Sequence, residues 1–282
     1  MILVADSGST KTDWVFFDTR DNLKSFRTVG INPYHQRMDE IRRIVEEELL
    51  PQTTGIDIST VTEVHFYGAG LATEQICSRM EDFLHGIFAA ATVSADSDML
   101  GAARALCGRT EGVTCVLGTG SNSCLFNGKE IVDQIPSLGY ILGDEGSAAA
   151  LGKRLLGDCM KHQLPEHICT AFLKRFDLNK EKVLDSVYKQ PLPNVFLASL
   201  APFLSENREL PEIHAMLINC FTEFFTRNVI TYHHPWLPVH FAGTLANVFS
   251  PELKETADML GMKIGNIMTS PIEGLIDYHL RS

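Results

Sequence analysis

The sequence predicts an α/β protein of two domains, and three observations lead to this prediction. Its 282 residues correspond to about two domains of roughly 150 residues each. Short apolar runs alternate with amphipathic stretches, as in folds whose helices cover a β-sheet. Residues 4–12 are echoed by residues 116–124, and each run reads as a strand, a turn of small residues and a second strand. This echo indicates a duplicated unit, although only weakly when taken alone.

The composition narrows the classes of function. The chain has 24 Lys and Arg residues against 35 Asp and Glu, a net charge of −11, which argues against a general binder of nucleic acid or membrane surfaces. Its apolar runs are far shorter than the roughly 20 residues that cross a bilayer. The N-terminus shows no basic leader, so we expect a cytoplasmic protein. Any phosphate that it binds must be met by a local site.

The first half reads as a complete α/β unit, with strands that are short and apolar and helices that repeat apolar residues at helical spacing. Strands are predicted at residues 2–5, 13–18, 23–29, 61–67 and 91–94, and helices at residues 37–50, 73–88 and 99–107.

The second half opens with a predicted strand at residues 113–117 and becomes mainly helical after Gly146. We therefore expect an N-terminal domain over 1–112 and a C-terminal domain with helical insertions over 113–270, with a last helix in 271–282 packing back on the first domain. Helices are predicted at residues 147–162, 166–176, 180–188, 195–204, 212–232 and 272–280, and a strand at 239–242.

The turn after the first strand has the composition of an anion site. Small residues let backbone N–H groups approach a phosphate, Lys11 offers a positive charge, and Asp6 offers a carboxylate for Mg²⁺. The turn lacks the spacing of a P-loop, so an ordinary hairpin with a surface lysine is the alternative. Its hydroxyl groups belong to Ser7, Ser9, Thr10 and Thr12.

Two later turns could bind other parts of a nucleotide or a sugar. The turn at residues 118–122 is uncharged and offers backbone N–H groups together with Thr119, Ser121 and Asn122. Residues 241–247 read as a strand, a glycine turn and the start of a helix, which suits the flat face or the ribose of a nucleotide. Without its context this segment is a plain βα turn.

Two carboxylates are candidates for chemistry. Asp98 follows a predicted strand and precedes a helix, so it either caps that helix or acts as a general base that accepts a hydroxyl proton, with Asp96 as its rival. Asp144 lies in the glycine-rich run 138–147, where it either forms a solvated polar cap or binds sugar hydroxyls.

As a set, these segments resemble the motifs of the sugar kinase, hsp70 and actin superfamily. Residues 6–12 resemble its first phosphate motif, residues 118–122 its second, and residues 242–246 its adenosine motif. The combination of Gly-Thr-Gly-Ser-Asn with the later Leu-Gly-Asp-Glu-Gly-Ser is similar to the N-acetylglucosamine kinases and their BadF/BadG/BcrA/BcrD ATPase relatives. The order and spacing of these motifs cover nearly the whole chain.

The resemblance implies a two-domain actin-like ATPase (ribonuclease H-like) fold with duplicated mixed β-sheet cores and with ATP and Mg²⁺ in an interdomain cleft. Asp98 would activate the 6-hydroxyl of the sugar, and Asp6 would hold Mg²⁺, directly or through water. The residues implied on the ATP side are Ser9, Thr10, Lys11, Thr119, Gly243 and Asn247. Those implied on the sugar side are Asn32, Asp98, Ser121, Asn122, Gly139 and Asp144.

The leading hypothesis is therefore an ATP-dependent kinase of N-acetylglucosamine or a related hexosamine. Its partners would be ATP and an amino sugar, without nucleic acid or membrane, and a homodimer is one assembly that we consider. One alternative is an ATPase that activates a partner redox enzyme, although the chain shows no recognisable iron–sulfur cluster motif. Another alternative is a regulator that senses a sugar without catalysis.

Overall fold

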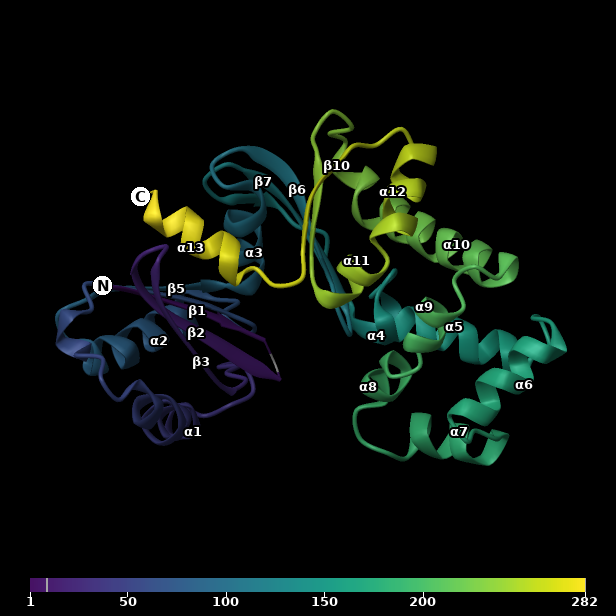
Figure 1. Ribbon diagram of the computed structural model, residues 1–282, viewed down its shortest axis with the longest axis horizontal. Coiled ribbons are helices and arrows are strands. Elements are labelled where there is room, and N and C mark those ends of the chain that lie inside the picture. Colours follow the sequence, from purple (N-terminus) through teal and green to yellow (C-terminus); the bar gives the residue numbers. More distant parts are fainter. Residues whose placement is uncertain (9, 282) are drawn as a thin grey trace. The chain divides into compact units, whose positions relative to one another are not determined.

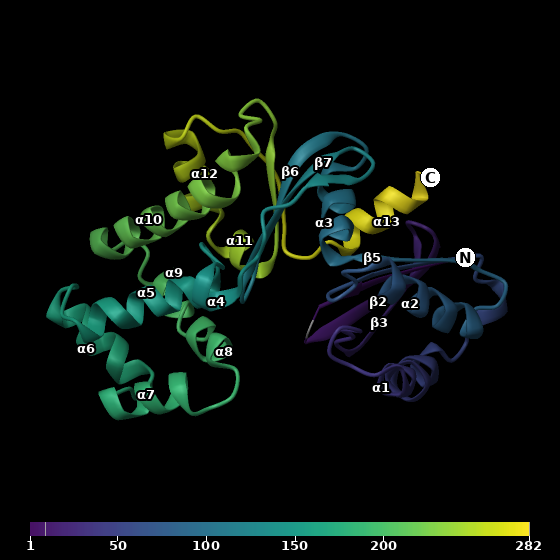
Figure 2. The same cartoon turned by 180° about the vertical axis from the view of Figure 1, so that it is seen from behind.

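The computed structural model describes residues 1–8 and 10–281, and these residues form two compact units. The first unit comprises Met1–Thr110, Gly128–Glu130 and the segment from Ser270 to the C-terminus, and the second comprises Glu111–Asn127 and Ile131–Thr269. Each unit is built on a five-stranded mixed sheet (Figures 1 and 2). No helix within the described part of the chain is long and apolar enough to span a membrane.

The first sheet has the strand order β3-β2-β1-β4-β5. Its central strand β1 pairs antiparallel with β2 and parallel with β4, and β4 pairs parallel with β5. The carboxyl ends of the three parallel strands consequently lie at one edge of the sheet. The strands are β1 (Ile2–Ser7), β2 (Lys11–Thr19), β3 (Asn22–Val29), β4 (Glu63–Gly68) and β5 (Thr92–Ser97).

Helices cover both faces of this sheet because successive residues of β1 point to opposite sides. Leu3 packs in one apolar cluster with residues of α1 and α2, whereas Val4 packs in another with residues of α3 and α13. Figure 1 shows these two pairs of helices on opposite faces. The helices are α1 (Met38–Arg43), α2 (Glu74–Ile87), α3 (Asp98–Cys107) and α13 (Ile272–Leu280).

The helix predicted at residues 37–50 is only partly α-helical. It continues from α1 as a π-helix, η1 (Ile44–Leu49), and ends as a 3₁₀ turn, η2 (Leu50–Thr53). Pro51 lies within the 3₁₀ turn, where its missing N–H group prevents the regular α-helical ladder from continuing. A further 3₁₀ turn, η3 (Ile58–Thr60), precedes β4.

The second sheet repeats the pairing of the first, with strand order β10-β9-β6-β7-β8. Its central strand β6 pairs antiparallel with β7 and parallel with β9, as β1 does with β2 and β4. The duplicated mixed sheet indicated by the sequence echo is therefore confirmed. The strands are β6 (Glu111–Leu117), β7 (Ser121–Asn127), β8 (Ile131–Asp133), β9 (Val239–Ala242) and β10 (Ile264–Met268).

Helices of the second unit bury one face of its sheet in a large apolar core that contains Phe224, Phe225 and Phe241. The helix predicted at residues 195–204 is two short helices, and the second begins at Pro202. The helices are α4 (Gly139–Leu142), α5 (Ala148–Met160), α6 (Glu166–Arg175), α7 (Lys180–Tyr188), α8 (Pro193–Ala198), α9 (Pro202–Glu206), α10 (Pro211–Asn228), η4 (Ile230–Tyr232), α11 (Thr244–Val248) and α12 (Ser250–Met259).

A polar contact fixes α13 on the first sheet. The Nε2 atom of buried His279 lies 2.9 Å from the Tyr67 hydroxyl, and its ring stacks on His65 with ring centres 3.8 Å apart. Burial, together with the nearby His65, Arg104 and Arg109, lowers the pKa of His279 to about 3. His279 is therefore neutral at physiological pH.

This histidine makes the stability of the first unit depend on pH. An unfolded histidine ionises near pH 6.5, so between pH 6.5 and 3 the unfolded state binds more protons and the free energy of unfolding falls as the pH falls. Between pH 7 and 5 this amounts to at most about 2 kcal/mol. We expect His279→Gln to show a smaller fall in melting temperature over that range in scanning calorimetry. Exposed His35, replaced in the same way, is the control; equal falls in wild type and His279→Gln would contradict the prediction.

Candidate active site

Two carboxylates lie at the carboxyl edge of the first sheet. Asp6 is the second-last residue of β1, and Asp98 directly follows β5. Ser7, Gly68 and Ser97 are register neighbours across β1, β4 and β5, so both acids lie close to the same row of the sheet. In open α/β sheets this edge is where ligands bind.

Asp98 is the first residue of α3 and not its cap. Ser97 is the N-cap, since its hydroxyl accepts the Leu100 N–H at 3.2 Å. The Asp98 carboxylate accepts the N–H of its neighbour Met99 at 2.9 Å and remains open to solvent. The helix approaches β4 closely at Gly101, where a Cβ atom would lie 2.8 Å from Tyr67.

Asp96, the alternative base, is already paired. Its Oδ2 atom lies 3.0 Å from the Arg104 guanidinium, which also donates to the Tyr67 hydroxyl at 2.9 Å. Asp98 has no ion pair among the described residues. The structure therefore favours Asp98 over Asp96 as the carboxylate that is free to accept a proton.

The electrostatics of this edge suit a cation. Burial, with the negative charges of Asp98 and Asp13, raises the pKa of Asp6 to about 7, while Lys11 and a hydrogen bond from Ser270 work in the opposite direction. Asp98 reaches solvent with part of its side chain, yet protein packed around its carboxylate removes enough water to raise its pKa as well. A divalent cation would relieve this repulsion, so the donor set fits Mg²⁺. Among the described residues no group of three or more His, Cys, Asp or Glu side chains is arranged to hold a metal, and Mg²⁺ commonly needs only one or two carboxylates together with phosphate oxygens.

The first loop is shorter than the sequence suggested, because β1 extends to Ser7 and β2 begins at Lys11. The turn closes with a hydrogen bond from the Gly8 N–H to the Lys11 carbonyl at 3.0 Å. The Ser7 and Thr12 hydroxyls are buried and lie 2.7 Å apart, so they are not available to a phosphate.

The remaining candidates of the first loop differ in their surroundings. Thr10 is exposed and available. Lys11 forms an ion pair with Asp13 at 2.5 Å while its side chain stays half exposed. Ser9 lies outside the described residues. Contact of these residues with phosphate stays a prediction.

Asn32 occupies a fixed position beside the first loop. Its side-chain oxygen accepts the Tyr34 N–H at 3.1 Å, and its backbone N–H donates to Gln36 at 2.7 Å. Gly70, with φ of +81°, follows β4, and a Cβ atom there would lie 2.0 Å from the Asn32 side-chain oxygen. The glycine turn after β4 thus makes room for this side chain, a role that sequence reasoning did not find.

In the second unit, the loop from Gly118 to Ser121 is held against the start of α5. The carbonyls of Gly118 and Thr119 accept the N–H groups of Ala148 and Ala149 at 2.9 and 3.1 Å. The Thr119 side chain is exposed. These contacts fix the loop and leave the Thr119 side chain accessible, whereas Ser121, the first residue of β7, is buried.

Asp144 lies against the same loop. Its Oδ1 atom accepts the Ser121 N–H at 3.2 Å and the Ser137 hydroxyl at 3.4 Å, and a Cβ atom on Gly120 would lie 3.0 Å from this carboxylate. Partial burial raises the pKa of Asp144. The structure therefore brings together Ser121 and Asp144, two of the predicted sugar residues.

Two further sugar candidates lie close by in the chain. The Asn122 side-chain oxygen accepts the Ser123 N–H at 2.9 Å and the Gln134 side-chain amide at 3.1 Å. Gly139 begins α4 with φ of +72°, a conformation that favours glycine. Their contact with a sugar stays a prediction.

Gly243 requires the absence of a side chain. Its φ is +118°, and a Cβ atom would lie 2.1 Å from the Leu117 carbonyl at the end of β6. The turn at Gly243 thus packs directly on β6, the strand that leads into the loop at Gly118. Asn247, one turn into α11, donates its backbone N–H to the Gly243 carbonyl at 3.1 Å, and its side chain is exposed.

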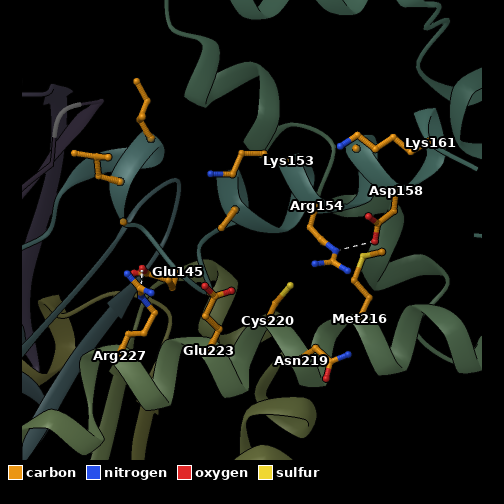
Figure 3. A pocket seen from close by; sticks show the side chains of 16 residues that line it. Glu145, Lys153, Arg154, Asp158, Lys161, Met216, Asn219, Cys220, Glu223 and Arg227 are labelled. Carbon is orange, nitrogen blue, oxygen red and sulfur yellow. Dashed lines mark hydrogen bonds and ion pairs between the residues drawn. The ribbon is translucent and has the colours of Figure 1, made fainter. Parts of the chain in front are cut away.

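A pocket of about 530 Å³ also lies in the second unit, between α5, α10 and residues 141–146 (Figure 3). None of the site residues predicted from the sequence lines it. Four of its charged side chains form ion pairs, Arg154 with Asp158 at 2.7 Å and Arg227 with Glu145 at 2.6 Å. The pocket therefore adjoins the segment that carries Asp144, because Gly143, Glu145 and Gly146 line it.

The duplicated sheets and the loops at their edges define the two-domain actin-like ATPase fold, a class that includes sugar kinases. Comparison with protein-family models finds no match, and comparison with curated proteins finds none either. A crystal structure of a Porphyromonas gingivalis protein described as a "putative N-acetylglucosamine kinase" is 43% identical, with a TM-score of 0.92, over 100% of this chain and 99% of that chain. The present chain belongs to the same family as the Porphyromonas gingivalis protein.

Two more distant structures share the fold. One, from Chromobacterium violaceum and described in the same words, is 18% identical with a TM-score of 0.63 over 98% of both chains. The other is a ROK family glucokinase from Streptomyces griseus, solved with glucose and AMPPNP, which is 12% identical with a TM-score of 0.60 over 98% of this chain and 97% of that chain.

The packing at Gly243 predicts a large effect of a small change. Gly243→Ala must change a φ of +118° and displace the Leu117 carbonyl, so we expect a loss of about 3 kcal/mol or more in the free energy of unfolding. Gly261→Ala is the matched control, because Gly261 also has positive φ but open space around it; it should lose only about 1–2 kcal/mol. Urea denaturation measures both, and equal losses would contradict the packing argument.

Proposed function

We propose that the protein is an ATP-dependent sugar kinase that transfers the γ-phosphate of ATP to the 6-hydroxyl of N-acetylglucosamine or a related hexosamine. The observation that supports this most directly is Asp98, a solvent-open carboxylate at the carboxyl edge of the sheet, without an ion-pair partner among the described residues. Membership in the family of the Porphyromonas gingivalis protein supports the same substrate class.

Asp98 acts as the general base in this proposal. The sugar hydroxyl gives its proton to the Asp98 carboxylate while its oxygen forms a bond to the γ-phosphorus, and the bond from that phosphorus to the bridging oxygen of ADP breaks. A raised pKa makes the carboxylate a better proton acceptor, provided that it is ionised when the sugar binds. Most of the remaining rate comes from positioning the two substrates.

Asp6 would hold Mg²⁺, directly or through water, and the ion would neutralise charge on the ATP phosphates. The donors proposed for the phosphates come from the turns after β1 and β6 and from the segment after β9, together with the first residue of β2. On the ATP side we propose Ser9, Thr10, Lys11, Thr119, Gly243 and Asn247, and on the sugar side Asn32, Ser121, Asn122, Gly139 and Asp144.

The deciding experiment is an assay of ADP release from ATP and Mg²⁺ over a panel of amino sugars and hexoses. We expect the highest kcat/KM with N-acetylglucosamine or another hexosamine, with 6-phosphorylated product identified by NMR. A folded protein that releases no ADP with any sugar would overturn the proposal, and sugar binding without turnover would favour a sensor. The molecular mass of the purified protein in solution tests whether two chains form a homodimer.

Asp98→Asn tests the catalytic assignment. The amide cannot accept the hydroxyl proton, so kcat should fall by about 10²–10⁴-fold, while ATP affinity measured by calorimetry should stay close to wild type. Asp96→Asn, two residues earlier at the end of β5, is the control and should retain most turnover, because Asp96 pairs with Arg104 and is not the proposed base. Turnover of Asp98→Asn at the wild-type rate would exclude Asp98 as the base.

A further inference from the structure

The segment that carries Asp144 has a strained backbone. Asp144 has φ of +56°, in the left-handed region that non-glycine residues enter at a cost of order 1–3 kcal/mol. Two residues later, Gly146 has φ of +68°, and a Cβ atom there would lie 2.8 Å from the Phe224 side chain of α10. Such a conformation persists only where the surrounding structure fixes it.

Glu145 supplies two contacts that fix this segment. Its Oε1 atom forms an ion pair with the Arg227 Nε atom at 2.6 Å, and its Oε2 atom accepts the Asn228 side-chain amide at 3.2 Å. The Glu145 side chain is only 14% exposed, so its charge is partly removed from water and depends on these partners. Figure 3 shows Arg227 and Glu145 facing each other at the edge of the pocket.

The C-terminal end of α10, which contacts Glu145, also contacts β7, the strand that follows the loop at Gly118. The Asn228 carbonyl accepts the Ser123 hydroxyl at 2.9 Å, and Ser123 follows Asn122 in β7. The same hydroxyl lies 2.8 Å from the Tyr232 hydroxyl. One helix end therefore fixes two elements that carry predicted sugar residues, β7 and the segment around Asp144.

We infer that Arg227 and Glu145 are positioning residues that hold the Asp144 carboxylate where a sugar hydroxyl can replace its hydrogen bonds to Ser121 and Ser137. The bond to Ser137 is long, at 3.4 Å, and is therefore weak. This inference rests on the proposed function and extends it to α10, which no sequence motif identified. Arg227 acts through Glu145 and does not itself touch substrate.

The test separates sugar binding from ATP binding. In Arg227→Gln the Glu145 carboxylate loses its cation and the segment loosens, so we expect KM for the sugar to rise about tenfold while KM for ATP stays within about twofold. Arg227→Lys keeps the charge and should recover part of the loss. Calorimetric sugar affinity without ATP should change in parallel with KM for the sugar.

The pocket offers a matched control. Arg154 also lines it and also forms a short ion pair, with Asp158, but this pair lies within α5 and does not touch the segment around Asp144. Arg154→Gln should leave KM for the sugar unchanged. The inference is wrong if Arg227→Gln folds and retains wild-type sugar affinity, if it raises both KM values equally, or if Arg154→Gln has the same effect.

Two further measurements keep the outcome decisive. If Arg227→Gln does not fold, Glu145→Gln removes the same ion pair and keeps one amide contact, so the same rise in KM for the sugar is expected.

If the wild type neither binds nor phosphorylates a sugar, the proposed function fails, and hydrogen exchange then tests the contact between Arg227 and Glu145 alone. Amides of residues 143–146 should exchange faster in Arg227→Gln than in Arg154→Gln, and equal rates would overturn the inference.

Discussion

The candidate site depends on how one central strand is paired in each unit. β1 and β6 each have an antiparallel neighbour on one side and a parallel neighbour on the other. The tight turn into the antiparallel neighbour therefore lies at the edge where the parallel strands also end. In the first unit, this pairing places the turn before Lys11 at the same sheet edge as Asp98. In the second unit, it places the turn before Ser121 at the same sheet edge as Gly243.

Close backbone packing then sets the positions of the groups at these edges. Gly101 lets α3 approach Tyr67, and Gly243 lets the third loop lie on the Leu117 carbonyl. In both places the missing side chain is a requirement of packing within one unit, whatever ligand is bound. Glycines that sequence motifs associate with phosphate or nucleotide therefore have a structural role as well, and mutating them would alter the fold and the site together.

Much of this architecture follows from the sequence, because apolar periodicity and turn residues act locally. The central strands, the echo of residues 4–12 and the helix that begins after Ser97 all have local signals. β10 was not predicted, since Gly265 and Asn266 interrupt its apolar pattern; Gly265 is needed because a Cβ atom would lie 2.4 Å from the His240 ring. The pairing of Glu145 with Arg227 joins residues far apart in the chain, and no spacing rule reveals it.

The acids at the first edge show why part of the site resists prediction from sequence. A motif identifies Asp6 as a carboxylate, but its protonation depends on burial and on the charges of Asp98 and Asp13, which come from two other strands or their ends. Asp13 is compensated, because hydrogen bonds from Lys11 and Arg27 outweigh its burial and hold its pKa below the usual range. For Asp6, burial and the neighbouring carboxylates outweigh the contributions of Lys11 and Ser270, so ionising it costs free energy in the protein alone. A cation beside Asp6 would lower that cost, so the repulsion among the acids at this edge favours the binding of a cation there.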